Sequence, residues 1–103
     1  MTGKRDLTAN IKRRFDHDAA KQVLKEKYEA KMLFAAFGGM WKAGPDLLCL
    51  TKLLGHMPGM VLLDEYGNPC KVVPFELHEL AAGRWQEQMN AWHHEFEELQ
   101  KQR

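Results

Sequence analysis

The stretch 75-FELHELAAGRWQEQMNAWHHEFEELQKQR-103 decides the fold of this chain. Its apolar residues recur every three or four positions, and most charged and polar residues lie between them. This spacing is typical of an amphipathic helix, which over these residues would be about 43 Å long. We therefore expect a long helix over about 75–101, whose apolar face is covered by the rest of the chain or by another molecule. The stripe on that face comprises Leu77, Ala81, Trp85, Met89, Trp92, Phe96 and Leu99.

A second long helix is predicted near the start of the chain. Residues 6–37 include neither Pro nor Gly and are rich in good helix formers. The helix either runs unbroken or restarts at Asp16 or Asp18, both of which are good N-cap residues. An unbroken helix is long enough to pack against the whole stripe. A break would leave Phe96 and Leu99 for a partner molecule.

The segment between the long helices is predicted to hold smaller elements. Gly38 and Gly39 are expected to end the first helix, and Pro45 is well placed to open a short helix over about 45–54. Two short β-rich runs flank a turn with Gly67, which predicts a hairpin over about 60–73. An isolated hairpin is only marginally stable in water, so we expect it to pack on the helices or to pair with another chain.

The expected fold is therefore mainly α with a small β-hairpin, in a single domain of 103 residues. Two long helices pack side by side, accompanied by the short central helix and the two-stranded hairpin. The relative direction of the long helices is left open, because the connection between them is long enough for either arrangement.

Charge is distributed unevenly along a chain whose formal net charge is only +1. Residues 1–31 carry nine Lys or Arg and five acidic residues, whereas residues 75–103 carry three and six. Opposite charge at the two ends can bring them together within one molecule or between molecules. The first residues lack the apolar segment of a signal peptide, and no apolar run is long enough to span a membrane. We expect a cytoplasmic protein, or a virion component if the source is a virus.

Residues for covalent catalysis are sparse. The chain contains no serine, and Cys49 is expected to be buried in the short helix. Cys70 is expected to be more exposed near the hairpin turn, but no base adjoins it in the sequence. Thr2, Thr8 and Thr51 show no triad pattern, and His78 is interpreted as a residue of the first two turns of the last helix. We therefore predict no catalytic residues and no cofactor.

A cluster of His93, His94, Glu97 and Glu98 is the best candidate for a metal site. His93 and Glu97 are one helical turn apart, and so are His94 and Glu98. The two pairs point about 100 degrees apart, and no third ligand is predictably near. The interpretation that we prefer is a solvated helix face, without a bound metal.

Two sets of residues are candidates for binding a partner. The first is the aromatic end of the stripe, because Trp and Met are enriched in the cores of interfaces. It comprises Trp85, Met89, Trp92, Phe96 and Leu99. The second set would contact phosphates or an acidic protein surface, and it comprises Lys4, Arg5, Lys12, Arg13 and Arg14.

These observations predict a small non-enzymatic interaction or structural protein, a component or assembly factor of a larger complex of several chains. The partners would be proteins, in a homo- or hetero-oligomeric assembly. A component of a virus or bacteriophage is one instance of this class. The alternative is a nucleic-acid-associated accessory or regulatory protein that uses the basic first helix, which is less favoured because a dedicated binder would carry a larger positive charge.

Overall fold

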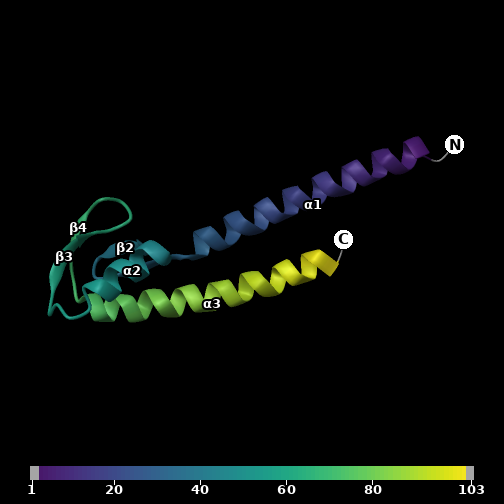
Figure 1. Cartoon of the computed structure of the whole chain (residues 1–103). Helices are drawn as coiled ribbons and strands as arrows, with labels where there is room; N and C mark the ends of the chain where they lie inside the picture. Colours follow the sequence, from purple (N-terminus) through teal and green to yellow (C-terminus); the bar gives the residue numbers. More distant parts are fainter. Residues whose placement is uncertain (1–2, 102–103) are drawn as a thin grey trace.

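A computed structural model describes the backbone of residues 3–101 and the side chains of residues 14–101. The molecule is elongated, with extents of 72 × 23 × 19 Å. It contains three helices and two small antiparallel hairpins in the described part (Figure 1). In chain order these are α1 (Gly3–Lys31), β1 (Leu33–Ala36), β2 (Gly39–Lys42), α2 (Pro45–Leu53), β3 (Met60–Leu63), β4 (Pro69–Val72) and α3 (Pro74–Lys101).

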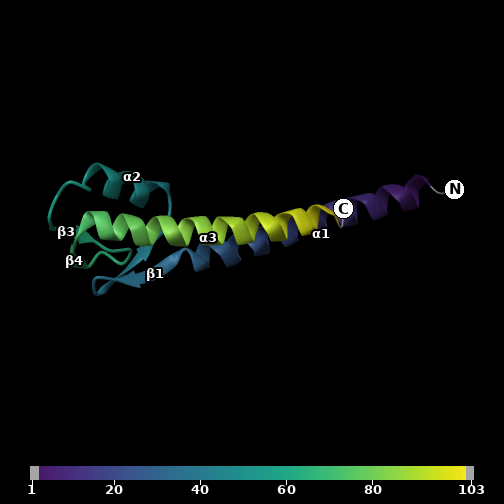
Figure 2. The same ribbon diagram turned by 90° about the horizontal axis from the view of Figure 1, so that it is seen from below.

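The two long helices lie side by side and run in opposite directions, as Figures 1 and 2 show from two sides. The mainly α class is therefore confirmed. Helix α1 passes through Asp16 and Asp18 without interruption, so the unbroken alternative is the one observed. Its first turns extend beyond the end of α3 (Figure 1).

The predicted end of the first helix is wrong, and so is the expected number of hairpins. Helix α1 ends at Lys31, and the residues expected to complete it form β1, which pairs with β2 to make a second hairpin. Its two-residue loop consists of Phe37 and Gly38, with φ of 52° and 76°. Two positive φ values are the pattern of a type I′ turn, which suits the twist of paired strands. Gly38 thus turns a hairpin, where we had expected it to end a helix.

Burial explains why this segment is a strand despite its helix-forming composition. Phe34 and Trp41 face each other across the β1–β2 pair, and both are buried. The indole Nε1 of Trp41 donates a hydrogen bond of 2.8 Å to the carbonyl oxygen of Ala36, inside the same hairpin. Tertiary packing of these two aromatic side chains outweighs the local helix propensity.

The other elements lie close to their predicted positions. Helix α2 begins with Pro45, and β3 pairs with β4 in the register Met60↔Val72 to Leu63↔Pro69. The inner face of this hairpin contributes Cys70 and Val72 to the core, so the hairpin packs on the rest of the chain.

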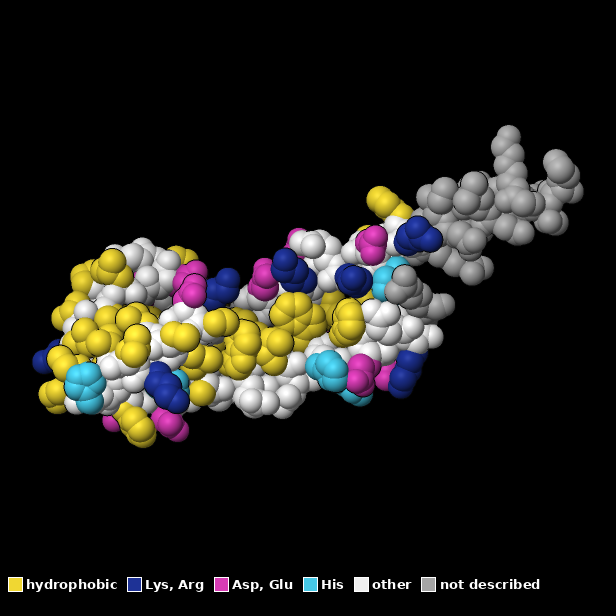
Figure 3. Space-filling model, viewed as in Figure 1, with side chains coloured by type: hydrophobic (Ala, Val, Ile, Leu, Met, Phe, Trp, Pro, Cys, Tyr) yellow, Lys and Arg dark blue, Asp and Glu magenta, His cyan; other side chains and the backbone are white. Residues whose placement is uncertain are grey.

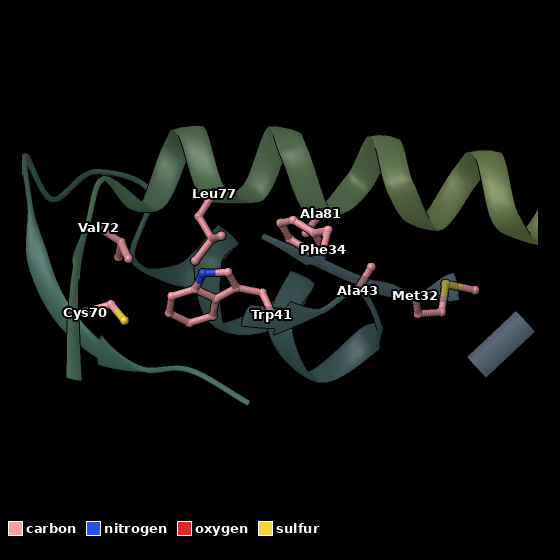
Figure 4. Close-up of a cluster of buried hydrophobic side chains, with 8 residues drawn as sticks. All are labelled: Met32, Phe34, Trp41, Ala43, Cys70, Val72, Leu77 and Ala81. Atoms are coloured by element: carbon pink, nitrogen blue, oxygen red, sulfur yellow. The ribbon is translucent and has the colours of Figure 1, made fainter. Parts of the chain in front are cut away.

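One hydrophobic core lies at the end of the molecule where the hairpins and α2 meet the first turns of α3. Figure 4 shows Leu77 and Ala81 of α3 directed toward Trp41 and Phe34. Its buried members are Met32, Phe34, Trp41, Ala43, Cys70, Val72, Leu77 and Ala81. We call residues 32–81 the head. The helix pair made by α1 and residues 82–101 of α3 is called the stalk.

The carboxylate of Asp64 joins the two hairpins of the head. One oxygen accepts hydrogen bonds from the backbone N–H groups of Tyr66 and Asn68, at 3.0 and 2.8 Å. The other accepts the N–H of Met40 in β2, at 3.0 Å. These backbone donors stabilise the ionised form and hold the pKa of Asp64 below its ordinary value.

Gly39 is needed at the same junction because the two hairpins approach closely there. A Cβ atom at this position would lie 2.7 Å from the Sγ atom of Cys70 and 3.0 Å from the Cβ atom of Asp64. Only a residue without a side chain fits without displacing its neighbours.

Candidate protein-interaction surface

The apolar stripe of α3 divides between the head and the stalk. Leu77 and Ala81 are fully buried in the head, and Trp85 and Met89 pack against its core while remaining partly exposed. Farther along the helix, Trp92, Phe96 and Leu99 are only half-buried. The unbroken first helix therefore covers this end of the stripe only in part, contrary to our expectation. A single neighbouring helix can contact only one side of each large side chain.

Packing between the stalk helices is centred on one aromatic pair. The rings of Tyr28 and Trp92 stack with their centroids 5.9 Å apart and their planes 7° from parallel. Tyr28 is 2% exposed, and burial raises the pKa of its phenol. The ammonium groups of Lys27 and Lys31 each lie 5.2 Å from the centroid of this ring, close enough for a cation–π attraction.

One ion pair joins the stalk helices beside this aromatic pair. The Nζ atom of Lys27 donates to both carboxylate oxygens of Glu95, at 2.8 and 3.1 Å. The hydrogen bond from Lys27 lowers the pKa of Glu95, and the same bond raises the pKa of Lys27. Both side chains are more than a third exposed, so solvent and salt weaken the attraction.

A shallow cleft lies along each side of the line where α1 and α3 meet. One, of about 390 Å³, is lined by Trp92 and Phe96 together with Asp18, Lys21, Gln22 and Lys25 of α1. The other, of about 280 Å³, is lined by Ala20, Leu24, Glu95, Glu98 and Leu99. Figure 3 shows a band of apolar side chains between the helices, bordered by charged groups. We call the side with Trp92 and Phe96 the open face.

Of the five predicted basic contacts, the structure describes the side chain of Arg14 alone. It is exposed on α1. The other four, Lys4, Arg5, Lys12 and Arg13, lie outside the residues whose side chains are described. Binding of nucleic acid by this segment stays an untested prediction.

The histidine and glutamate cluster near the end of α3 forms a surface ion pair. The Nε2 atom of His93 lies 3.3 Å from a carboxylate oxygen of Glu97, and both side chains are exposed. Among the described residues, no group of three or more His, Cys, Asp or Glu side chains is arranged to hold a metal ion.

The predicted environments of the two cysteines are both wrong. Cys49 is exposed on the outer side of α2, whereas Cys70 is buried in the core. The alternation of β4 places Cys70 on its inner face beside Gly39, which the proximity of a turn could not indicate. Cys49 is exposed because α2 is covered on one side only.

A buried hydroxyl connects α2 to α3. The Oγ1 atom of Thr51 lies 2.9 Å from the Nδ1 atom of His78 and 2.8 Å from the carbonyl oxygen of Leu47. Although a hydroxyl beside an imidazole is also found at nucleophilic sites, Thr51 is 0% exposed. The contact with His78 joins α2 to α3, whereas the bond to Leu47 lies within α2.

A second apolar surface, on the head, was not predicted. Leu50 and Leu53 of α2 and Val61 and Leu63 of β3 are all exposed. A cleft of about 470 Å³ lies between these elements, with Leu50 and Leu63 in its lining. One feature of the sequence could have indicated this surface. The segment that forms α2 is apolar on more than one side, so any side that the chain leaves uncovered exposes apolar residues.

Comparison of the chain with models of protein families, with curated proteins and with solved structures gave no match. Among the described residues, no helix combines the length and the apolar character needed to cross a membrane.

Proposed function

We propose that this chain is a small non-enzymatic interaction protein, which acts as a component of a larger assembly of protein chains. The observation that supports the proposal best is the apolar band of the stalk. Trp92, Phe96 and Leu99 are large side chains that the chain itself covers only in part. Contiguous apolar surface rimmed by charged residues is typical of protein interaction sites.

Energetics also favour a partner on this band. Full burial of a large apolar side chain contributes about 1.5–3 kcal/mol relative to exposure. A partner that completes the burial of several such side chains would therefore stabilise the complex relative to the isolated chain. Aromatic side chains that are half-buried and already held in place also lose less conformational entropy on binding than mobile ones.

Native mass spectrometry of material from the natural source tests this proposal. We expect the chain to be found in a complex with at least one other chain, its own kind included. Phe96→Ser should weaken that complex, because Phe96 lies on the band. Phe75→Ser is the matched control, since Phe75 is exposed on the same helix at the head. The proposal fails if the chain is isolated as a free monomer.

A further inference from the structure

The outer edge of β3, on the side away from β4, carries backbone groups that the chain does not pair. The N–H of Asp64 donates to the carbonyl oxygen of Asn68 at 2.9 Å, which continues the register of the two strands. Antiparallel strands exchange hydrogen bonds at every second pair of residues. Val61 and Leu63 therefore direct their N–H and C=O groups away from β4. Pro69, which lies opposite Leu63, has no N–H and fits this alternation.

These four backbone groups are open to a partner. Within the part of the chain that the structure describes, none of them forms a hydrogen bond. The strand Met60–Leu63 carries no charged side chain, and Val61 and Leu63 are exposed. The strand also lies at the end of the head, as Figures 1 and 2 show from two sides. An exposed apolar edge without charges is able to accept a further strand.

The other strand edges of the head are less open. The outer edge of β4 carries Pro69 and Lys71, and both residue types discourage strand addition. On β2, the outward N–H and C=O groups of Met40 are already bonded to Asp64 and Glu65. On β1, a side chain beside the edge shares a cleft with charged residues of α3, namely Glu79, Arg84 and Glu87.

The edge of β3 adjoins the largest cleft described on the head. Leu63 lines this cleft of about 470 Å³, together with Leu47 and Leu50 of α2. Its volume is in the range of pockets that hold small ligands, about 300–1,000 Å³. The N–H of Glu65 donates to the carbonyl oxygen of Met40 at 2.7 Å, so β2 borders the chain just beyond Leu63. An unpaired strand edge thus lies beside an apolar cleft and a helix.

From this arrangement we infer that the edge of β3 binds an extended segment of another protein as an added strand. The backbone of the segment pairs with the N–H and C=O groups of Val61 and Leu63. Its side chains alternate in direction, so one set packs against the exposed side chains of these two residues. In this mode of recognition the main chain supplies affinity, and pockets for side chains supply specificity. An apolar side chain of the segment enters the cleft beside Leu50.

Charge around the cleft specifies the segment further. The lining includes the carboxylates of Asp46, Asp64 and Glu65, and the ammonium group of Lys42. Asp46 and Glu65 are exposed, and neither forms an ion pair among the described residues. A Lys or Arg of the segment gains a carboxylate partner here, whereas an acidic segment is repelled. The segment is therefore apolar at alternate positions and carries a basic residue.

Selection from a library of random heptapeptides displayed on phage tests the inference, with the folded chain of 103 residues as the target. We expect the enriched sequences to combine apolar residues at alternate positions with a Lys or Arg. The variant Val61→Pro serves as the counter-target, because it lacks one N–H of the edge. If no sequence is enriched on wild type relative to this variant, the inference is overturned.

A matched pair of proline variants separates the two edges of the hairpin. Val61 and Lys71 are opposite each other, and the N–H of each points away from the other strand. We expect Val61→Pro to weaken binding of a synthetic selected heptapeptide at least about tenfold, and Lys71→Pro to change it by less than about twofold. Fluorescence anisotropy measures both, and circular dichroism checks that both variants are folded. Equal losses in two folded variants would overturn the inference.

Methylation of the peptide provides a test that leaves the protein unchanged. In an added strand, the N–H groups of alternate residues face β3, and those between them face solvent. Single N-methylation along the selected heptapeptide should therefore weaken binding strongly at every second position of its central part and weakly between them. Losses without this alternation would exclude binding as a strand.

Neutralising the rim tests the preference for a basic segment. Asp46→Asn with Glu65→Gln should weaken binding at least about threefold, because the basic residue loses its partners. The control is Glu76→Gln with Glu79→Gln, which makes the same change in net charge at exposed positions of α3 and should leave binding unchanged. An unchanged affinity in the first double variant would overturn the basic preference.

Sedimentation velocity excludes a second copy as the occupant. Self-association of the wild-type chain that Val61→Pro abolishes would mean that the edges of two copies pair, and it would overturn the inference. The proposed function would stand in either case, because it depends on the stalk and is tested by Phe96→Ser.

Discussion

The head and the stalk are built from similar side chains but bury them to different degrees. Trp41 of the head is 2% exposed, whereas Trp92 of the stalk is only half-buried. The head places α2 and two hairpins over α3, while the stalk provides only the single neighbouring helix α1. Burial in this molecule therefore depends on how many elements surround a side chain. An aromatic residue at helical spacing does not by itself indicate a core position.

Replacing one tryptophan of each region by alanine should give the largest difference in stability between the head and the stalk. We expect Trp41→Ala to lower the free energy of unfolding by about 3–5 kcal/mol, because it leaves a cavity in a closed core. That loss is a large share of the stability of a small domain. Trp92→Ala should cost clearly less, because its side chain is already partly in water. Urea denaturation of both variants, followed by circular dichroism, measures the difference, and equal losses would contradict the comparison.

Adding one methyl group to a glycine should have opposite effects in the two regions. Gly39→Ala in the head should destabilise by about 1–3 kcal/mol, because its Cβ atom would overlap Cys70. A Cβ atom at Gly83 in the stalk has no neighbouring atom within 4 Å. Gly83→Ala should therefore stabilise the helix by about 0.5–1 kcal/mol. Thermal unfolding measures both changes, and a loss of stability in the Gly83 variant would mean that this position is not open.

Acid should weaken the head through Asp64. The pKa of this carboxyl is lower in the folded chain than in the unfolded one. The ionised carboxylate therefore contributes its full stabilisation of the fold when the pH is above the ordinary aspartate pKa of about 4. The contribution is lost as the pH falls through the lower pKa of the folded state. We expect Asp64→Asn to be less stable at neutral pH and to lose less stability on acidification.

Denaturation midpoints measured from neutral to acidic pH test this expectation. Glu79→Gln is the matched control, since it makes the same change from carboxylate to amide at an exposed position of α3. Parallel pH profiles for wild type and Asp64→Asn would show that the carboxylate does not hold the hairpins together.

Of the interactions tested, the ion pair of the stalk should contribute least to the stability of the fold. Lys27→Met or Glu95→Gln should lower the melting temperature only slightly, because both groups are exposed enough to be screened. The effect should shrink in about 1 M salt, where the Debye length is only about 3 Å. A double-mutant cycle of the two positions isolates the interaction. A coupling that is insensitive to salt would contradict this assignment.

Much of the fold could be predicted from the sequence, because α3 has a sustained apolar periodicity and residues 6–37, which include most of α1, contain neither Pro nor Gly. The hairpin of β1 and β2 could not, since Phe34 and Trp41 are brought together by packing against α3. Phe37 also adopts a positive φ, which is uncommon for an aromatic residue. Its residue type therefore does not indicate a hairpin turn in the sequence. Of the candidate surface, the stripe was identified in advance. Its partial exposure depends on the number of covering elements, which periodicity does not report.

The ion pair of Lys27 and Glu95 also has a consequence for the order of folding. These residues are 68 positions apart, whereas Met40 and Asp64 in the head are 24 apart, and each hairpin joins near neighbours. Closing a longer loop costs more chain entropy and is slower. Once the head has folded, however, it serves as a short, ordered connection between the two helices. We therefore expect the head to form first. The contacts between α1 and α3 should form last, beginning beside the head and continuing toward the far end of the stalk.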